Sequence, residues 1–433
     1  MSRILKVNTK DKLRALLTDV LPYELPLWFS NFYMYTCLAE TKVRGIYETV
    51  SGKKFDKWDV PLIPLTYLIY RSENKSPRAI SIMHPVAQFQ VCEFYSKYED
   101  IIEYYCTRSQ HSLRYPYRVA SRFYGKAQKG RVGTVGVETV DEEPVVASSY
   151  FKYKQHAFLH QFFESYDYHR LEKKFPSMLQ VDIAKCFPSI YTHSIGWAVK
   201  GKRLAKTRSH GSFDVDFDRL MQLTNYKETN GIIVGPEVCR IFAEVILQKI
   251  DINLVAVMNK KGWDVSKHYD FRRYVDDYFV FYSSEGVRSD FVHVLESCLL
   301  EYKMYLNEAK TVKASRPFAT EISLAKSFLR REVEEYFCAR FANNDAAAAG
   351  IIDIKEPGKR ANQSISALKM AMARCHVEYS SVSNFLMAAI VTKSKQYYSG
   401  REFKTKFKPP LIAFPYSFHS EKFPYIPQTT VFP

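Results

Sequence analysis

Two adjacent aspartates, Asp276 and Asp277, interrupt an otherwise apolar and aromatic stretch of the chain. The runs on either side, HYDFRRYV (268–275) and YFVFYS (278–283), are typical of strands, so the pattern predicts a β-hairpin with both acids at its turn. Ionised carboxylates are costly to bury in such a setting unless they are paired, hydrogen-bonded or bound to a metal ion. A turn that merely tolerates aspartate would normally be wholly polar and contain Gly or Asn. The pattern therefore favours a functional acidic site.

A third acid, Asp182, ends another apolar segment, SMLQVDI (177–183), which reads as a buried strand. Two strand-end carboxylate sites supply the oxygen ligands that two Mg²⁺ ions require. Two such ions, ~3.5–4 Å apart, can activate a 3′-hydroxyl and stabilise a leaving pyrophosphate. A pair of capped turns without a metal ion is the alternative.

The charge balance predicts a polyanionic partner. The 433 residues include 62 Lys+Arg and 46 Asp+Glu, which gives a formal net charge of +16. The basic residues cluster and alternate with Tyr and Phe, as in nucleic-acid-binding proteins, so RNA or DNA is the expected partner. A basic stretch from Arg108 to Arg131 predicts a loop or hairpin that binds phosphates non-specifically. A basic surface that only aids solubility is the alternative.

The remaining patterns predict a mixed α+β protein of two or three packed units. Gly235 and Pro236 precede a long apolar helix, with Pro at its first position. The segment 291–302 has the spacing of an amphipathic helix, with Ser289 as its N-cap. A mostly helical segment is expected from about 330 to about 396. The chain has no membrane-length apolar run, no signal-peptide pattern and no C-x-x-C pair, so we expect a soluble cytoplasmic protein without a membrane partner.

At the level of motifs, the sequence resembles the reverse transcriptases. Four segments match their motifs A to D in order: VDIAKCF (181–187), TNGIIVGPEVCRIFAE (229–244), YVDD (274–277) and LNEAKT (306–311). The resemblance covers residues 105–330 and implies a right-hand polymerase fold of fingers, palm and thumb. It suggests an N-terminal region with part of the fingers (1–104), fingers (105–175), palm (176–330), a helical thumb (331–400) and an extended C-terminal tail (401–433).

The resemblance also assigns roles within the acidic site. Asp182, Asp276 and Asp277 fall on the family's catalytic metal-binding acids, and Ile183, the residue after Asp182, is counted with them as a metal ligand. Asp182 and Asp276 would bridge both ions, which are two Mg²⁺, with Mn²⁺ as a possible substitute. Lys310 matches the motif D lysine, a candidate general acid for pyrophosphate; a solvated helix-end lysine is the alternative.

A second group of residues is implied in nucleotide binding. Phe187 falls where the family keeps an aromatic steric gate that selects deoxynucleotides, and core packing is its alternative. Gly235 permits close approach of the backbone. The cations expected to clamp the triphosphate are Arg118, Arg122, Lys152 and Lys154.

Motif B departs from the family, because Ile233-Val234-Gly235 stands where Pro-Gln-Gly is usual. Its GxxxGPE form, together with SIYTHS (189–194) and LPYELPLWFSN (21–31), is similar to the bacterial defence-associated reverse transcriptases, the unknown-group and abortive-infection-like enzymes. More narrowly, it resembles the second enzyme of type III defence systems, which works with a companion reverse transcriptase and a non-coding RNA.

The resemblance therefore implies an RNA-directed DNA polymerase that adds dNTPs to a 3′-hydroxyl in antiphage defence. Its expected partners are RNA, DNA, dNTPs, a non-coding RNA and either a companion reverse transcriptase or further copies of itself. If the product is of low complexity or not conventionally templated, a side chain has to read the incoming base. Glu24 is the first candidate and Asn31 the second, with surface or turn residues as the alternative. A catalytically silent RNA-binding scaffold and a retron-type or intron-type enzyme are the other functional alternatives.

Overall fold

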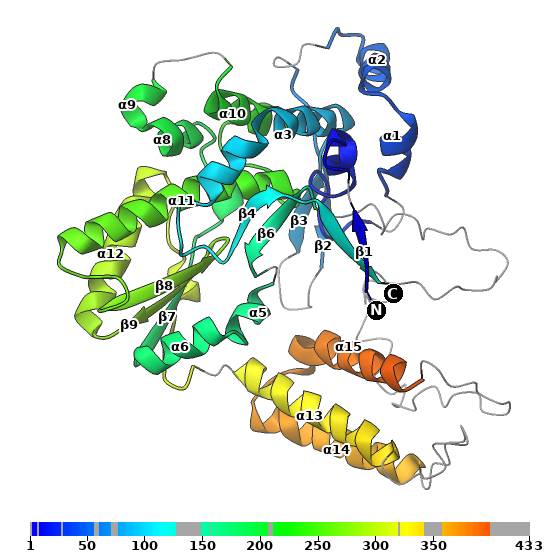
Figure 1. Cartoon of the computed structure of the whole chain (residues 1–433), viewed down its shortest axis with the longest axis vertical. Coiled ribbons are helices and arrows are strands. Elements are labelled where there is room, and N and C mark those ends of the chain that lie inside the picture. Colours follow the sequence, from blue (N-terminus) through cyan, green and yellow to red (C-terminus); the bar gives the residue numbers. More distant parts are fainter. Residues whose placement is uncertain are drawn as a thin grey trace, which may run out of the picture. The chain divides into compact units, whose positions relative to one another are not determined.

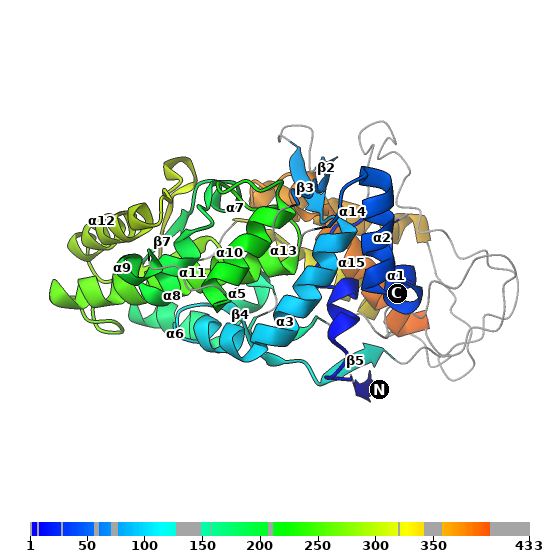
Figure 2. The same cartoon turned by 90° about the horizontal axis from the view of Figure 1, so that it is seen from above.

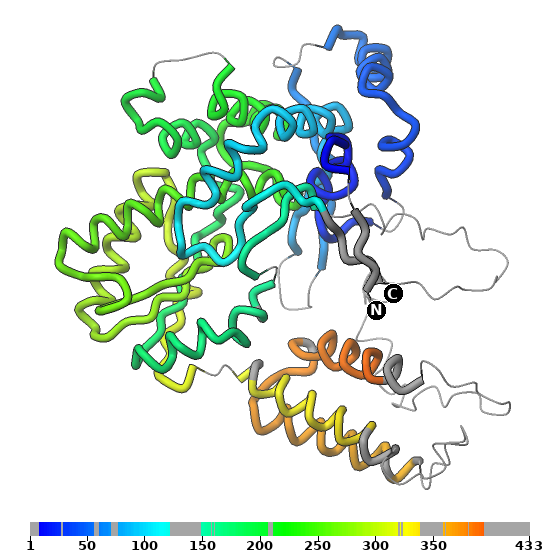
Figure 3. Tube along the Cα trace, viewed as in Figure 1, coloured from blue at the N-terminus to red at the C-terminus, as the bar shows by residue number. Residues whose placement is uncertain are grey.

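A computed structural model describes residues 2–6, 8–26, 29–55, 60–70, 77–126, 149–156, 158–206, 211–318, 321–341 and 357–398. The chain forms two compact units, the first comprising residues 1–71 and 76–316 and the second residues 72–75 and 317–433. Helices and strands mix in the first unit, which confirms the α+β expectation. The chain can be followed through its rainbow colours in Figure 3.

The first unit begins with short elements around one long helix (Figure 1). Its elements up to the acidic hairpin are β1 (Ser2–Lys6), η1 (Lys12–Leu17), α1 (Phe32–Cys37), α2 (Glu40–Ser51), β2 (Leu65–Ile69), β3 (Arg78–Ile82), α3 (Pro85–Cys106), β4 (Arg114–Val119), β5 (Arg122–Lys126), β6 (Phe151–Gln155), α5 (Leu159–Phe163), α6 (Tyr166–Lys174), β7 (Ser177–Asp182), α7 (Cys186–Ser189), α8 (Ser194–Lys200), α9 (Lys202–Ala205), α10 (Phe213–Thr224) and α11 (Glu237–Lys260). The remaining elements of this unit are β8 (Tyr269–Tyr274), β9 (Asp277–Tyr282), α12 (Glu285–Glu301), η3 (Glu308–Lys310) and β10 (Val312–Ser315).

A four-stranded antiparallel sheet with the order β10-β7-β9-β8 forms the centre of this unit. Strand β7 and the β8–β9 hairpin confirm the predicted strand at 177–183 and the predicted hairpin around Asp276 and Asp277. In the register, Asp182 at the end of β7 lies opposite Asp277 at the start of β9. Residues that are 95 positions apart in the sequence therefore become direct neighbours across the sheet.

Both faces of the sheet are covered at its central strands, which explains why the residues of β9 after Asp277 are all apolar or aromatic. On one face, Phe271 packs on Phe291 of α12, and Tyr278 donates a hydrogen bond to Asp251 of α11. On the other face, Phe279 packs on Phe163 of α5, while Phe281 contacts Tyr168 of α6. Figures 1 and 2 show α12 and α6 on opposite sides of the strands.

The basic stretch that begins at Arg108 forms strands, but these strands do not pair with each other. Strand β4 pairs with β6, whereas β5 pairs with β1, as in the pairs Arg118↔Lys152 and Lys6↔Arg122. The expected hairpin is therefore wrong for residues 114–126, because each strand finds its partner in a distant part of the chain. Residues 127–131 lie outside the described residues.

Two predicted helix starts are shifted. Pro236 is the N-cap residue of α11 and not its first helical residue. Helix α12 begins at Glu285 after Ser284, so the expected N-cap at Ser289 is wrong and Ser289 lies inside the helix. The physical reason is that Val287 is also buried, which extends the apolar stripe of this helix toward its N-terminus.

The second unit contains three helices in the part that is described: α13 (Glu321–Phe341), α14 (Pro357–Arg374) and α15 (Tyr379–Tyr398). Its core includes Leu329 of α13, Leu368 of α14 and Val382 of α15. The unit boundary at residue 317 precedes the expected palm–thumb boundary at 331, because α13 packs with the later helices. The expected tail at 401–433 lies outside the described residues. Within the described ranges, no helix has the length and apolarity needed to cross a membrane.

Candidate active site

The three acids meet where β7 ends and the β8–β9 hairpin turns. Asp277 begins β9 opposite Asp182, and Asp276 lies in the turn just before it. The amide of Ile183 donates a hydrogen bond to the carbonyl of Asp276 (3.2 Å), which fixes the two strand ends together. The sheet thus gathers all three predicted carboxylate residues at one place.

The segment that carries the motif D lysine closes this site. Lys310 Nζ donates to Asp182 Oδ2 at 2.7 Å, although two thirds of the lysine side chain (67%) is exposed. Asn307 contacts the same aspartate twice, through its amide N to the Asp182 carbonyl (2.8 Å) and through Nδ2 to Oδ2 (3.3 Å). Lys310 is therefore an ion-pair partner of Asp182, and it also ends the short helix η3 and stays largely exposed, as the alternative of a solvated helix-end lysine expects.

Burial, hydrogen bonding and neighbouring charges change the proton affinities of these groups. Burial, and then the charge of Asp182, raises the pKa of Asp276. Burial also raises the pKa of Asp277 to about 6, with further contributions from the charges of Asp276 and Asp182. The hydrogen bond to Asp182 raises the pKa of Lys310, so its ammonium stays protonated near neutral pH. The site holds more negative charge than Lys310 alone can balance.

The donor set fits a hard divalent cation. Carboxylate oxygens are the ligands that Mg²⁺ prefers, and a cation would relieve the repulsion that contributes to the raised pKa values of Asp276 and Asp277. No group of three His, Cys, Asp or Glu side chains in the described part of the chain already has the arrangement of a metal site. Because Asp182 is paired with Lys310, cation binding requires this aspartate to be shared or released.

Phe187 follows Asp182 by five residues, in the short helix α7 that comes after β7. Its side chain is partly buried against the core, as the core-packing alternative expects, and the role of a steric gate stays a prediction. The motif B loop packs on this helix, since Ile232 N donates to the Phe187 carbonyl (2.9 Å). Gly231 makes this approach possible: it has φ +88°, and a Cβ atom there would lie 2.7 Å from the Pro188 carbonyl oxygen. Gly231 was not singled out from the sequence, although it lies within motif B.

Gly235 was expected to permit close approach of the backbone, and in the structure the space at its Cβ position is filled by other segments of the chain. A Cβ atom at this position would lie 2.7 Å from Pro22 Cβ and 3.2 Å from the Ser81 carbonyl oxygen. Three residues before Pro22 in the sequence, the carbonyl of Asp19 accepts hydrogen bonds from Glu237 N (2.8 Å) and Val238 N (3.2 Å). The N-terminal segment therefore caps helix α11 and covers Gly235 at motif B.

The two candidates for base reading differ in their surroundings. Glu24 is exposed, and its backbone carbonyl accepts a hydrogen bond from the hydroxyl of Tyr67. Asn31 is buried, and its Nδ2 donates to the Leu16 carbonyl (2.7 Å) and to Gln88 Oε1 (2.5 Å). The Asn31 amide thus serves the packing of the N-terminal region, whereas the Glu24 carboxylate faces solvent.

Three of the four predicted phosphate-binding cations lie on the β4–β6 ladder. Arg118 is opposite Lys152, and both are exposed, as is Lys154 two residues further along β6. The segment before β4 joins the edge of β8, because Leu113 N donates to the Arg273 carbonyl (2.7 Å) and Arg273 N to the His111 carbonyl (2.8 Å). The ladder therefore starts beside the strand that leads to the acids. Arg122 lies in β5, and its side chain is outside the described part.

A buried ion network beneath the acidic turn was not predicted. Arg273 is fully buried and contacts Glu244 and Asp251 on α11. A signal was present in the sequence: these acids stand seven residues apart in an apolar helix, on one face, and the arginine interrupts an apolar strand.

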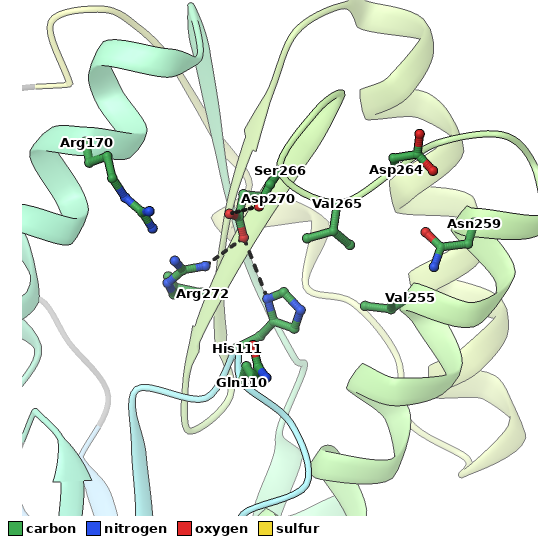
Figure 4. Close-up of a pocket in the computed structure, with 10 residues that line it drawn as sticks. All are labelled: Gln110, His111, Arg170, Val255, Asn259, Asp264, Val265, Ser266, Asp270 and Arg272. Atoms are coloured by element: carbon green, nitrogen blue, oxygen red, sulfur yellow. Dashed lines mark hydrogen bonds and ion pairs between the residues drawn. The ribbon is translucent and has the colours of Figure 1, made fainter.

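A pocket of about 520 Å³ opens near the start of β8, between α6, α11 and residues 264–266 (Figure 4). Arg272 Nη1 donates to Asp270 Oδ1 (2.7 Å) within it, and Ser266 Oγ donates to Asp270 Oδ2 (3.2 Å). None of the predicted site residues lines this pocket.

Comparisons with known proteins give structural likeness only. Neither a protein-family model nor a curated protein matches the chain. Among solved structures, apo telomerase from Candida tropicalis matches with a TM-score of 0.40 and 11% identity, over 83% of this chain and 72% of that one. Telomerase from Candida albicans, in complex with a fragment of telomeric RNA, matches with a TM-score of 0.38 and 10% identity, over 84% of this chain and 67% of that one.

Proposed function

We propose that the chain is a reverse-transcriptase-like DNA polymerase with a right-hand fold, which adds dNTPs to a 3′-hydroxyl. The observation that carries the proposal is the meeting of Asp182, Asp276 and Asp277 at one strand junction, in the order of motifs A and C. Their crowding creates a site that favours divalent cations.

In the proposed nucleotidyl transfer, different residues of the chain bind the metal ions, donate a proton and select and attract the nucleotide. Asp182, Asp276 and Asp277, with Ile183 beside them, would hold two Mg²⁺ ions. The chemistry supplied by such ions is activation of a 3′-hydroxyl and stabilisation of the charge that develops on pyrophosphate. Lys310, protonated and within reach of Asp182, donates a proton to the leaving pyrophosphate. Phe187 excludes a ribose 2′-hydroxyl, and the exposed cations of the β4–β6 ladder attract the triphosphate.

The proposal is tested by incorporation of labelled dNTPs by the purified full-length protein, with Mg²⁺ and with RNA or DNA primers, in the presence and absence of a template. Asp276→Asn removes a carboxylate at nearly constant volume and should abolish incorporation. Asp264→Asn is the matched control, because Asp264 is exposed and lies outside the acidic site. Incorporation by the Asp276→Asn variant at the wild-type rate would refute the site assignment. A wild-type protein that binds RNA without incorporation would instead support a silent scaffold.

The defence role, the non-coding RNA and the companion enzyme rest on the sequence resemblance and stay predictions. Base reading by Glu24 is compatible with its exposed carboxylate. Sequencing the DNA made by a Glu24→Gln variant tests it, and an unchanged product would exclude the role.

A further inference from the structure

Arg273 is the residue that connects the acidic turn to the body of the protein. It lies on β8, three residues before Asp276, and its side chain is 0% exposed. Its Nε and Nη2 atoms contact the Asp251 carboxylate at 2.9–3.1 Å, and its Nη1 and Nη2 atoms contact Glu244 at 2.8 and 3.1 Å. Nη1 also donates to the backbone carbonyl of Val275 (3.0 Å).

The partners of Arg273 are themselves held in place. Tyr278 donates to Asp251 (3.0 Å), and Gln248 donates to Glu244 (2.8 Å). Both acids belong to α11, so the guanidinium is fixed by a long buried helix and not by the turn that it contacts. A guanidinium suits this position because its rigid fork serves several acceptors at defined angles.

The turn needs such support because its backbone is unusual. Val275 has φ +57°, in the left-handed region that a β-branched residue rarely adopts. The carbonyl that follows this unfavourable angle is the one that Arg273 binds. The next two residues are Asp276 and Asp277, so any rotation of the Val275 peptide would redirect both carboxylates.

We propose that Arg273 is a positioning residue, which keeps Asp276 and Asp277 directed toward Asp182 by holding the Val275 carbonyl from helix α11. The inference deepens the proposed function and rests on it. The arginine does not contact the acids of the site itself, and it acts through the turn.

The test compares conservative substitutions of two neighbouring arginines. Arg273→Lys keeps a positive charge between the two α11 acids but loses the fork that reaches Val275. Arg272→Lys is the matched control, because Arg272 is also buried and ion-paired on β8. Its bonds go to Asp270 (2.7 Å, Figure 4) and to Asp167 on α6 (2.7 Å), on the opposite face from Arg273.

Four quantities are measured for each full-length variant: the dissociation constant for Mn²⁺ by electron paramagnetic resonance, kcat and KM for dNTP incorporation, and the melting temperature. Arg273→Lys should weaken Mn²⁺ binding roughly tenfold or more and lower kcat, since residues that orient metal ligands from outside the coordination sphere typically have effects of this size. Arg272→Lys should lower the melting temperature while Mn²⁺ binding stays within twofold of wild type. Equal Mn²⁺ affinities in wild type and Arg273→Lys, or an equal loss in both variants, would overturn the inference.

If Arg273→Lys does not fold, the triple variant Arg273→Met/Glu244→Gln/Asp251→Asn replaces it, because it removes the buried charges together. Weakened Mn²⁺ binding by the folded triple variant supports the inference, and wild-type affinity overturns it. Failure of the proposed function is distinguishable: it shows as a wild-type protein that binds Mn²⁺ but incorporates no dNTP, and the Mn²⁺ comparison still decides on Arg273. A wild-type protein that binds no Mn²⁺ would overturn both.

Discussion

Burial and, after it, neighbouring negative charge determine the proton affinities of the aspartates at the acidic site. Asp276 and Asp277 have raised pKa values because burial disfavours their ionised forms and neighbouring carboxylates repel them. Lys310 offsets part of this repulsion through its ion pair with Asp182. The remaining repulsion is concentrated at the place where Mg²⁺ is proposed to bind.

The raised pKa of Asp277 has a measurable effect on stability. A carboxyl that is harder to ionise in the folded state contributes stability below its ordinary pKa near 3.8, and this is lost as the pH rises through about 6. Asp277→Asn should therefore stabilise the protein in EDTA at pH 7.5, by at most about 3 kcal/mol, and the gain should disappear below pH 4. Thermal denaturation across this pH range is the measurement. A gain that is absent at pH 7.5, or that grows toward acid pH, would contradict the pKa shift.

Gly231 is a second residue whose role can be measured. A side chain at φ +88° is strained, and its Cβ would collide with the Pro188 carbonyl. Gly231→Ala should cost about 2 kcal/mol or more in the free energy of unfolding. The control is Gly286→Ala in α12, where a Cβ meets nothing within 4 Å and where alanine should be neutral or stabilising. Urea denaturation of both variants decides, and equal stabilities would show that the loop can move away from Pro188.

At the scale of residues, the sequence predicted the three acids but not Arg273 and Gly231, which hold the neighbouring backbone in place. Asp182, Asp276 and Asp277 stand out because charges end or interrupt apolar strands, and the sheet register that joins Asp182 to Asp277 follows from the strand pairing. Arg273 is as unusual in its setting, yet its partners are distant in sequence and only the packing of α11 on β8 identifies them. Gly231 needs the fold as well, because its neighbour Pro188 lies in a distant segment of the chain, just after motif A.

Among the elements, the N-terminal 3₁₀ helix η1 is hydrogen-bonded to the β4–β6 ladder at the end where β4 stops and β6 begins. Arg14 Nη1 donates to the Ala120 carbonyl (2.7 Å) and Nη2 to the Tyr150 carbonyl (2.8 Å), which are the residues that follow β4 and precede β6. The arginine is buried, so both bonds are shielded from water. One side chain thus joins the ends of the two strands that carry the candidate phosphate-binding cations.

Arg14→Met should therefore loosen the ladder while leaving the central sheet intact. Its loss leaves two buried carbonyls without this donor, which costs roughly 1–3 kcal/mol. Hydrogen exchange should become faster in residues 114–120 and 150–155 but not in 177–182. Arg44→Met in α2 is the control, since Arg44 pairs with Glu40 of its own helix. Unchanged exchange in the ladder would show that strand pairing alone holds its base.

Element predictions from the sequence succeeded where a pattern is local and failed where pairing is distant. The strand at 177–182 and the β8–β9 hairpin are local patterns, and both are confirmed. The basic stretch was misread because β4 and β5 are adjacent in sequence but pair with β6 and β1. The start of α12 was misplaced because buried Val287 extends its apolar face by one turn.

For the molecule as a whole, the division into two units separates the acidic site from a helical unit with its own core. All predicted catalytic residues lie in the first unit. The sequence resemblance placed the palm–thumb boundary at 331, inside α13. The structure places the boundary between the units at 317, because α13 packs with α14 and α15, which lie far downstream in the sequence. Leu329 of α13 is 0% exposed and packs in a core with residues of α14 and α15.

The division predicts that damage in one unit stays local. Leu329→Ala creates a cavity that should cost about 2–5 kcal/mol in the second unit. Hydrogen exchange should rise in α13, α14 and α15, while β7, β8 and β9 keep their protection. Leu324→Ala, on the same helix but 43% exposed, is the control and should have little effect. Faster exchange across the central sheet would show that the two units unfold together.

The cap that Asp19 places on α11 has a consequence for synthesis on the ribosome. Its carbonyl binds the amides of Glu237 and Val238, which are made 218 and 219 residues later. At roughly 5–20 residues per second, the N-terminal segment waits some 10–40 seconds for the helix that it caps. The β4–β6 ladder is complete before then, so Arg14 gives the segment an earlier anchor. We therefore expect the first unit to assemble outward from the ladder, with its acidic sheet completed last.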